Sequence, residues 1–180
     1  MRITGGIYRG RKLHTIAGLT VRPTTDRVRE SIFNILMHET GDAHVIDIFA
    51  GSGALGIDAL SRGAASAVFV ESGHEQVAAI RKNLESVGLE QTILPVDYRE
   101  ACRLLEEQGK KFDLIFADPP YEQITPQEVA ETVLQYNLLS RDGLLIIEHK
   151  AGSRVDSDKL TLLKTRKFGQ TEVSFYAGKK

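Results

Sequence analysis

Short runs of apolar residues alternate with amphipathic stretches along most of the chain. The stretches between the runs place apolar residues at helical spacing, which indicates helices with one buried face. Apolar strands that alternate with such helices predict a parallel sheet that is buried on both faces. The five predicted strands lie within residues 44–50, 66–72, 92–97, 112–120 and 143–150.

The two ends of the chain depart from this rhythm. Residues 160–169 and 171–178 resemble strands but are joined at Gly169 without room for a crossover helix, so we expect them to pair antiparallel. Residues 3–21 resemble short strands of a hairpin or extended arm, and a helix capped by Thr24 or Thr25 follows. The whole pattern predicts an α/β fold: a mostly parallel seven-stranded sheet with an antiparallel C-terminal strand, and helices on both faces.

Length and composition narrow the class of protein. The 180 residues suit one domain, and the one cysteine, Cys102, excludes an internal disulfide and fits a reducing cytoplasm. No apolar run approaches the roughly 20 residues of a membrane helix, and the N-terminus lacks the apolar core of a signal peptide. The five histidines show no metal-ligand spacing. We therefore expect a cytoplasmic monomer without metal or membrane contacts.

The net charge of −1 conceals an uneven distribution. Residues 1–30 contain seven basic and two acidic residues, a net charge of +5, which leaves −6 for the other 150 residues. A polyanion would meet this positively charged segment first. The alternative is a solvated terminus without a binding role, which would have the same composition. We divide the chain into a basic arm or hairpin, residues 1–22, and a main domain, residues 23–180. The candidate phosphate contacts are Arg9, Arg11, Lys12, Arg27 and Arg29.

A glycine loop with acidic neighbours follows the first of the five strands. A G-x-G-x-x-G pattern between a strand and a helix lets the backbone turn tightly and approach a ligand, but dinucleotide-binding proteins share it. Three acids sharpen the signal because they lie near the carboxyl ends of the first three strands, where open parallel sheets bind ligands. The glycines are Gly51, Gly53 and Gly56, and the acids are Asp47, Glu71 and Asp97.

These acids suit a cofactor that carries positive charge. Glu71 can accept both hydroxyls of a ribose, Asp97 can reach an adenine amino group, and Asp47 can face an ammonium. A pyrophosphate would be repelled, and the loop has no lysine or arginine to balance it. The pattern therefore predicts a sulfonium cofactor with an adenosine head and an amino-acid tail. The alternative is that Asp47 and Glu71 only cap helices.

The fourth strand ends in the tetrapeptide DPPY, residues 118–121. Two successive prolines hold the backbone extended and leave carbonyls that only accept hydrogen bonds. The Asp118 side chain and the Pro119 carbonyl can therefore both accept from one planar amine, while Tyr121 offers a flat face to the ring that bears it. Pro120 completes the rigid turn. The alternative is a strand-ending turn without chemistry.

In this order, the segments ITGGIYRGRKL, RPTTDRVRESIFNIL, DIFAGSGALGIDALSRGA and FDLIFADPPY resemble the RsmD family, bacterial enzymes that methylate N2 of a guanine in small-subunit ribosomal RNA. The resemblance spans nearly the whole chain. It implies a Rossmann-like class I methyltransferase fold over residues 23–180, S-adenosylmethionine as cofactor, and ribosomal RNA or the small ribosomal subunit as partner.

The resemblance also implies roles for particular residues. Asp118 to Tyr121 would form the target-amine site, and the glycine loop with its three acids would hold the cofactor. Arg22 and Thr24 would lie near the carboxylate of the cofactor or near the substrate. The basic residues near the N-terminus become candidate RNA contacts.

Three other functions remain open at this stage. DPPY serves adenine and guanine amines alike, so an amino-methyltransferase acting on another RNA or on DNA adenine N6 is the nearest alternative. A dehydrogenase that uses NAD would fit the glycine loop but leave DPPY unexplained. A non-catalytic RNA-binding module would bind RNA without transferring a methyl group.

Overall fold

The computed structural model describes residues 1–16 and 25–179. Its helices are α1 (Asp26–Ile35), α2 (Ala54–Ser61), α3 (His74–Ser86), α4 (Tyr98–Glu107) and α5 (Pro126–Gln135). Its strands are β1 (His44–Ile48), β2 (Ser66–Val70), β3 (Thr92–Leu94), β4 (Phe112–Ala117), β5 (Leu139–Lys150), β6 (Leu160–Phe168) and β7 (Thr171–Gly178). Across these described ranges, no helix is both long enough and apolar enough to cross a membrane.

All seven strands join one sheet in the order β3-β2-β1-β4-β5-β7-β6. Strands β1 to β5 pair in parallel, and β7 is antiparallel to both of its neighbours. This arrangement confirms the predicted mostly parallel seven-stranded sheet with an antiparallel C-terminal strand. Strand β5 begins at Leu139, earlier than predicted, and its register with β4 shifts between Phe112 and Leu114.

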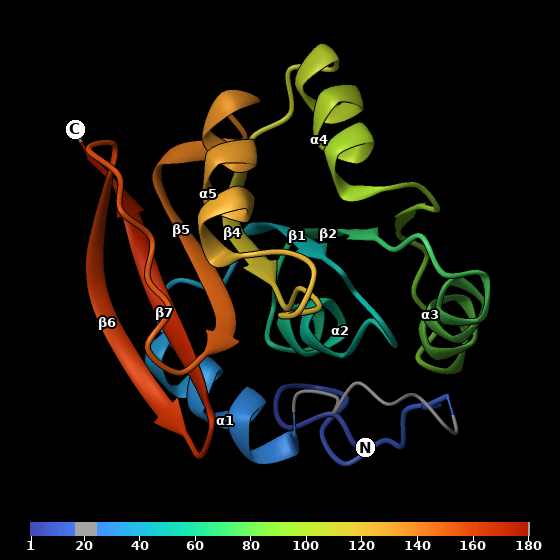
Figure 1. The fold of residues 1–180 in the computed structure, drawn as a ribbon. Coiled ribbons are helices and arrows are strands. Elements are labelled where there is room, and N and C mark those ends of the chain that lie inside the picture. The colour runs from blue at the N-terminus through green and yellow to red at the C-terminus, as the bar shows by residue number, and fades with distance from the viewer. Residues whose placement is uncertain (17–24, 180) are drawn as a thin grey trace.

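Helices cover both faces of the sheet, as predicted. Figure 1 shows α1, α2 and α3 on one side of the strands and α4 and α5 on the other. Side chains of β4 alternate between the two layers: Leu114 and Phe116 belong to the first core, and Ile115 and Ala117 to the second. Because successive residues of a strand point to opposite faces, a strand buried on both faces must be apolar throughout.

The N-terminal segment packs against the first helical layer. An antiparallel bridge joins Arg2 to Lys12, and Ile3 and Leu13 are buried in the same core as α1 and α2. The amide of Thr4 donates to Asp58 Oδ1 on α2 at 2.7 Å. Residues 1–14 are thus attached to α2. The predicted boundary at residue 22 falls outside the described residues and stays a prediction.

Arg29 on α1 is the charged centre of this attachment. Its Nε donates to Asp58 Oδ2 at 2.8 Å, and neither side chain is exposed to solvent. Its Nη2 donates to Asp26 Oδ1 at 2.9 Å and to the carbonyl oxygen of Arg2 at 2.5 Å. The prediction that Arg29 contacts RNA phosphates is therefore wrong, because its guanidinium is enclosed and neutralised inside the protein.

Replacing Arg29 with alanine should lower the free energy of unfolding by about 3–5 kcal/mol, because the buried Asp58 carboxylate would lose its cation. The control is Arg103→Ala, whose half-exposed partners Glu100 and Glu107 should make the loss small. Urea denaturation followed by circular dichroism measures both variants. A loss at Arg29 no larger than at Arg103 would show that the buried pair does not hold α1 to α2.

Candidate active site

The candidate site lies where the strand order reverses. From β1 the chain proceeds outward through β2 and β3, whereas β4 and β5 lie on the other side of β1. Ligands of open parallel sheets bind beyond the carboxyl ends of the strands at such a point. Asp47 lies near the end of β1, in register with Phe116 of β4, and Asp118 follows β4 directly. The fold therefore brings the glycine loop and DPPY together.

The glycine loop needs glycine at two positions. Gly51 and Gly53 have φ angles of 57° and 77°, in the left-handed region that side chains disfavour. Gly53 is the N-cap of α2 and has no side chain to accept a hydrogen bond; Asp47 Oδ2 accepts one from the amide of Gly56 at 2.9 Å instead. The acid on β1 thus caps α2 from outside the helix. Nothing lies within 4 Å of a Cβ built on Gly51, so a ligand can approach this backbone.

The third glycine serves packing. A Cβ on Gly56 would lie 2.4 Å from the ring of Phe69 on β2, which only glycine avoids. The amide of Gly56 is already occupied by Asp47. Gly56 therefore serves the contact between α2 and the sheet, and its predicted contact with the cofactor stays a prediction.

The other two acids lie at the ends of the next two strands. Glu71, directly after β2, accepts from the amide of Gly51 at 2.9 Å and from the amide of Gly73 at 2.8 Å. Asp97, beyond β3, is exposed and caps α4 by accepting from the amide of Arg99 at 2.9 Å. All three acids therefore accept backbone hydrogen bonds, although the capping alternative concerned only Asp47 and Glu71. The two oxygens of a carboxylate offer about four acceptor positions, so these bonds leave acceptor capacity for a ligand even at Glu71.

Negative charge accumulates around Asp47. Burial raises the pKa of Asp47 from 3.8 to about 8, the amide of Gly56 opposes this rise, and Asp118 and Glu71 add to it. The last two contributions place Asp118 and Glu71 each within electrostatic reach of Asp47. A cation bound here would favour the ionised form of Asp47.

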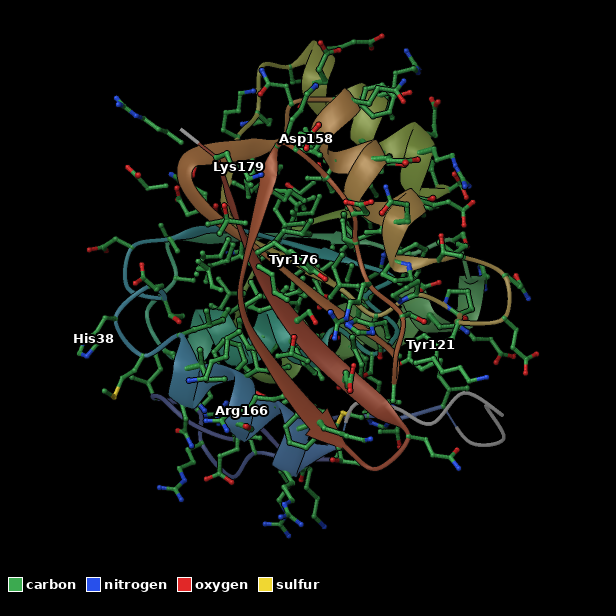
Figure 2. The ribbon with its side chains drawn as sticks, turned by 60° about the vertical axis from the view of Figure 1, so that its left-hand side comes forward. His38, Tyr121, Asp158, Arg166, Tyr176 and Lys179 are labelled. Atoms are coloured by element: carbon green, nitrogen blue, oxygen red, sulfur yellow. The ribbon has the colours of Figure 1, made fainter. Side chains whose placement is uncertain are left out.

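DPPY forms a turn that is anchored at both ends. The hydroxyl of Tyr121, labelled in Figure 2, donates to Asp118 Oδ1 at 3.0 Å. The carbonyl of Pro120 accepts from the amides of Gln123 and Ile124 at 2.9 and 3.1 Å. Burial raises the pKa of Tyr121, with further contributions from Asp118 and Glu148, so the hydroxyl remains a donor. The prediction that Tyr121 stacks on the target ring stays a prediction.

Glu148 is a member of this group that the sequence analysis missed. It is 8% exposed near the carboxyl end of β5 and interacts with Tyr121. Strand periodicity could have identified it, because Ile146 and Glu148 share one face of β5 and an acid in an otherwise apolar strand is unusual. The next residue, His149, bonds Ser174 on β7 at 2.8 Å.

The remaining predicted residues divide into two groups. Arg22 and Thr24 lie outside the described residues. Arg9, Arg11, Lys12 and Arg27 are exposed; Arg11 also donates to the carbonyl of Ser86 at 3.1 Å. Within the described ranges, no cluster of three or more His, Cys, Asp or Glu residues could hold a metal ion.

The N-terminal segment reaches the glycine loop itself. The side-chain amide of Asn83 on α3 donates to the carbonyls of Ser52 at 2.9 Å and His14 at 3.1 Å. The hydroxyl of Ser52 lies 3.6 Å from the sulfur of Met1. The exposed basic residues are therefore part of a segment that packs beside the candidate cofactor loop.

Comparison with known proteins agrees with this geometry. The family model described as "Conserved hypothetical protein 95" matches residues 1–177. Ribosomal RNA small subunit methyltransferase D of Escherichia coli K12 is 38% identical over 148 residues, which are 82% of this chain and 74% of that protein. The chain belongs to the RsmD family. The protein of the same name from Haemophilus influenzae is 31% identical over 98% of this chain and 93% of its own length.

Solved structures resemble this RsmD-family protein over its full length. A candidate methyltransferase from Escherichia coli has a TM-score of 0.89 and 32% identity, and the match covers 99% of this chain and 98% of that one. A candidate methylase from Haemophilus influenzae has a TM-score of 0.82 and 28% identity, with coverage of 99% and 98%. The Rossmann-like methyltransferase fold predicted from the sequence is confirmed.

The raised pKa of Asp47 predicts how stability depends on pH. A carboxyl whose pKa is higher in the folded protein holds its proton more tightly there, so its contribution to stability declines as pH rises from about 4 to about 8. The Asp47→Asn variant keeps an acceptor for Gly56 but cannot ionise. Its free energy of unfolding, relative to wild type without cofactor, should increase over this range and then level off.

Urea denaturation at a series of pH values measures this difference. The Asp42→Asn variant, changed in an exposed turn, controls for the substitution itself. Curves for Asp47→Asn and wild type that run parallel from pH 4 to pH 8 would contradict the raised pKa.

Proposed function

We propose that this protein transfers the methyl group of S-adenosylmethionine to the exocyclic N2 amine of a guanine in small-subunit ribosomal RNA. The observation that carries the proposal is the meeting of the glycine loop with DPPY at the reversal between β1 and β4. The relatives named ribosomal RNA small subunit methyltransferase D support the choice of substrate. Such a substrate would place the protein in the cytoplasm.

The residues around the glycine loop fit this cofactor. S-adenosylmethionine supplies a methyl group on a positively charged sulfur. The buried, crowded Asp47 favours a cationic ligand, and Gly51 leaves its backbone open to it. Glu71 can accept the ribose hydroxyls, and Asp97 can accept from the adenine amino group. No lysine or arginine lies between Asp47 and Ser61, which disfavours a dinucleotide.

The chemistry required of the protein is to orient and polarise the target amine. Its lone pair is delocalised into the base, so acceptors aimed at its hydrogens favour the tetrahedral nitrogen needed for attack. Asp118 Oδ1 accepts from Tyr121, and Oδ2 can accept from the amine together with the Pro119 carbonyl. As the nitrogen–carbon bond forms, the sulfur–carbon bond breaks and its electron pair stays on sulfur. The methylated nitrogen then loses one proton to water.

Ribosomal RNA from cells lacking this protein provides the direct test. Incubated with the purified protein and cofactor labelled in the methyl group, small-subunit RNA or assembled subunits should acquire label at N2 of one guanine. Nuclease digestion and mass spectrometry identify the base. Label on adenine would support the alternative amino-methyltransferase, and RNA binding without transfer would support a non-catalytic module.

Replacing Asp118 with asparagine should lower kcat by roughly 100- to 1,000-fold, the usual loss for one polar group that stabilises a transition state. Asparagine keeps an acceptor for the Tyr121 hydroxyl but can turn an amide N–H toward the target amine. Cofactor affinity measured by calorimetry should stay within a factor of about two, because Asp118 acts on the amine. A variant with the kcat of wild type would contradict the proposed amine clamp.

The exposed basic residues of the N-terminal segment should supply RNA affinity. Changing Arg9, Arg11 and Lys12 together to alanine should flatten the slope of log K against log salt by up to roughly 2–3 units, because each phosphate contact releases counterions. Cofactor affinity should not change. The control replaces Lys164, Arg166 and Lys167 on the exposed strand β6 (Figure 2). Filter binding at several salt concentrations measures the RNA affinity of both triple variants. A loss of affinity confined to the β6 variant would indicate that RNA binds at β6 and not at the N-terminal segment.

A further inference from the structure

Glu148 and Asp118 are neighbouring acids, and the proposed chemistry gives a role only to Asp118. Ala117 of β4 is in register with Ile147 of β5, so the next residue on each of these parallel strands is Asp118 and Glu148. The side chain of Glu148 lies on the face that carries Asp47, Phe116 and Ile146, because alternate residues of a strand share a face. Two carboxylates thus lie side by side, one directly after β4 and the other within β5.

Both acids are engaged by the same hydroxyl. Tyr121 donates to Asp118 Oδ1 at 3.0 Å. Glu148 follows Asp118 among the charges that raise the pKa of this tyrosine, so it lies within reach of the same hydroxyl. Each carboxylate has two oxygens and about four acceptor positions, so either acid can accept from a substrate in addition to its partners within the protein. A substrate at Asp118 therefore meets a second carboxylate beside the first.

The pattern of acceptors distinguishes the two purines that DPPY alone treats alike. The edge of guanine carries two adjacent donors, the N1–H and the N2 amine. Adenine presents an acceptor at N1, which an ionised carboxylate repels. Side chains that read the edges of bases in nucleic acids follow the same donor and acceptor logic.

We propose that Glu148 determines the specificity for guanine by accepting a hydrogen bond from N1–H while Asp118 accepts from the N2 amine. The inference rests on the proposed function, because it concerns the base that occupies the same site. Glu148 takes no part in bond making. Its carboxylate fixes which edge of the base faces Asp118, and it excludes a base with an acceptor at N1.

The test compares guanine with 2-aminopurine at the position that labelled methyl transfer identifies. 2-Aminopurine keeps the N2 amine but has an acceptor at N1 and no oxygen at position 6. Small-subunit RNA carrying either base at that position is prepared by splinted ligation, and kcat/KM is measured for wild type and Glu148→Gln. The missing oxygen affects both enzymes, so it cancels when the guanine to 2-aminopurine ratios are compared.

Wild type should prefer guanine, and the Glu148→Gln variant should lower this preference by at least roughly tenfold, because the glutamine amide can donate to an acceptor at N1. Glu172→Gln on β7 is the control: its Oε2 accepts from the amide of Gly152 at 3.2 Å, a bond that glutamine can keep, and its ratio should match wild type. Thermal unfolding and calorimetric cofactor binding establish that each variant is folded.

Three outcomes would overturn the inference. One is an unchanged ratio in Glu148→Gln, which would make Glu148 an anchor for Tyr121 alone. The second is equal use of both bases by wild type. The third is a folded, cofactor-binding Glu148→Gln variant that methylates neither base. If wild type fails to label any guanine of the ribosomal RNA, the proposed function itself fails, and this result is distinct from the other three.

Discussion

The buried ion pair between Arg29 and Asp58 is the constraint on which the surroundings of the site depend. A guanidinium without solvent must be neutralised and fully hydrogen-bonded, and here the partners come from three segments: Asp58 on α2, Asp26 on α1 and the carbonyl of Arg2. Asp58 also accepts from Thr4. The pair therefore fixes α1 and the N-terminal segment to α2, the helix that begins at the glycine loop. This ion pair therefore fixes where the N-terminal segment lies relative to the glycine loop, and with it the position of any contact that the segment makes with a substrate.

The carboxyl ends of the strands impose a second electrostatic condition. Burial raises the pKa of Asp47, which accepts from the amide of Gly56, and the charges of Asp118 and Glu71 raise this pKa further. Two features offset the repulsion in this cluster: the raised pKa keeps Asp47 largely protonated at neutral pH, and backbone amides donate to Asp47 and Glu71. The same acids become favourable partners when a cation arrives. Capping and ligand binding are therefore compatible roles, and the hydrogen bonds that order the loop also orient its acids.

The arrangement separates two tasks on adjacent strands. Asp47 in β1 and Glu71 after β2 suit the cofactor, whereas Asp118 after β4 and Glu148 in β5 suit the base. The reversal of strand order lets both groups face one space. Tyr121 connects to the second group only, through Asp118 and Glu148. From this division we expect substitutions in one group to affect mainly cofactor binding and substitutions in the other to affect mainly base selection.

The sequence by itself determined the fold class, the strand and helix order, the glycine loop and DPPY, because each depends on periodicity or on residues close together in the chain. The roles of Arg29 and Gly56 and the position of Glu148 depend on contacts between distant parts of the chain, so they became visible only in the tertiary structure. The sequence suggests that Arg29 lies at the surface, but its guanidinium is buried against Asp58, which is 29 positions away. Gly56 is required by the ring of Phe69 on another element. Glu148 lies beside Asp118 because β5 is the neighbour of β4. Local patterns report which face of an element is buried, but the identity of its neighbour depends on strand order and packing, which no short stretch of sequence encodes.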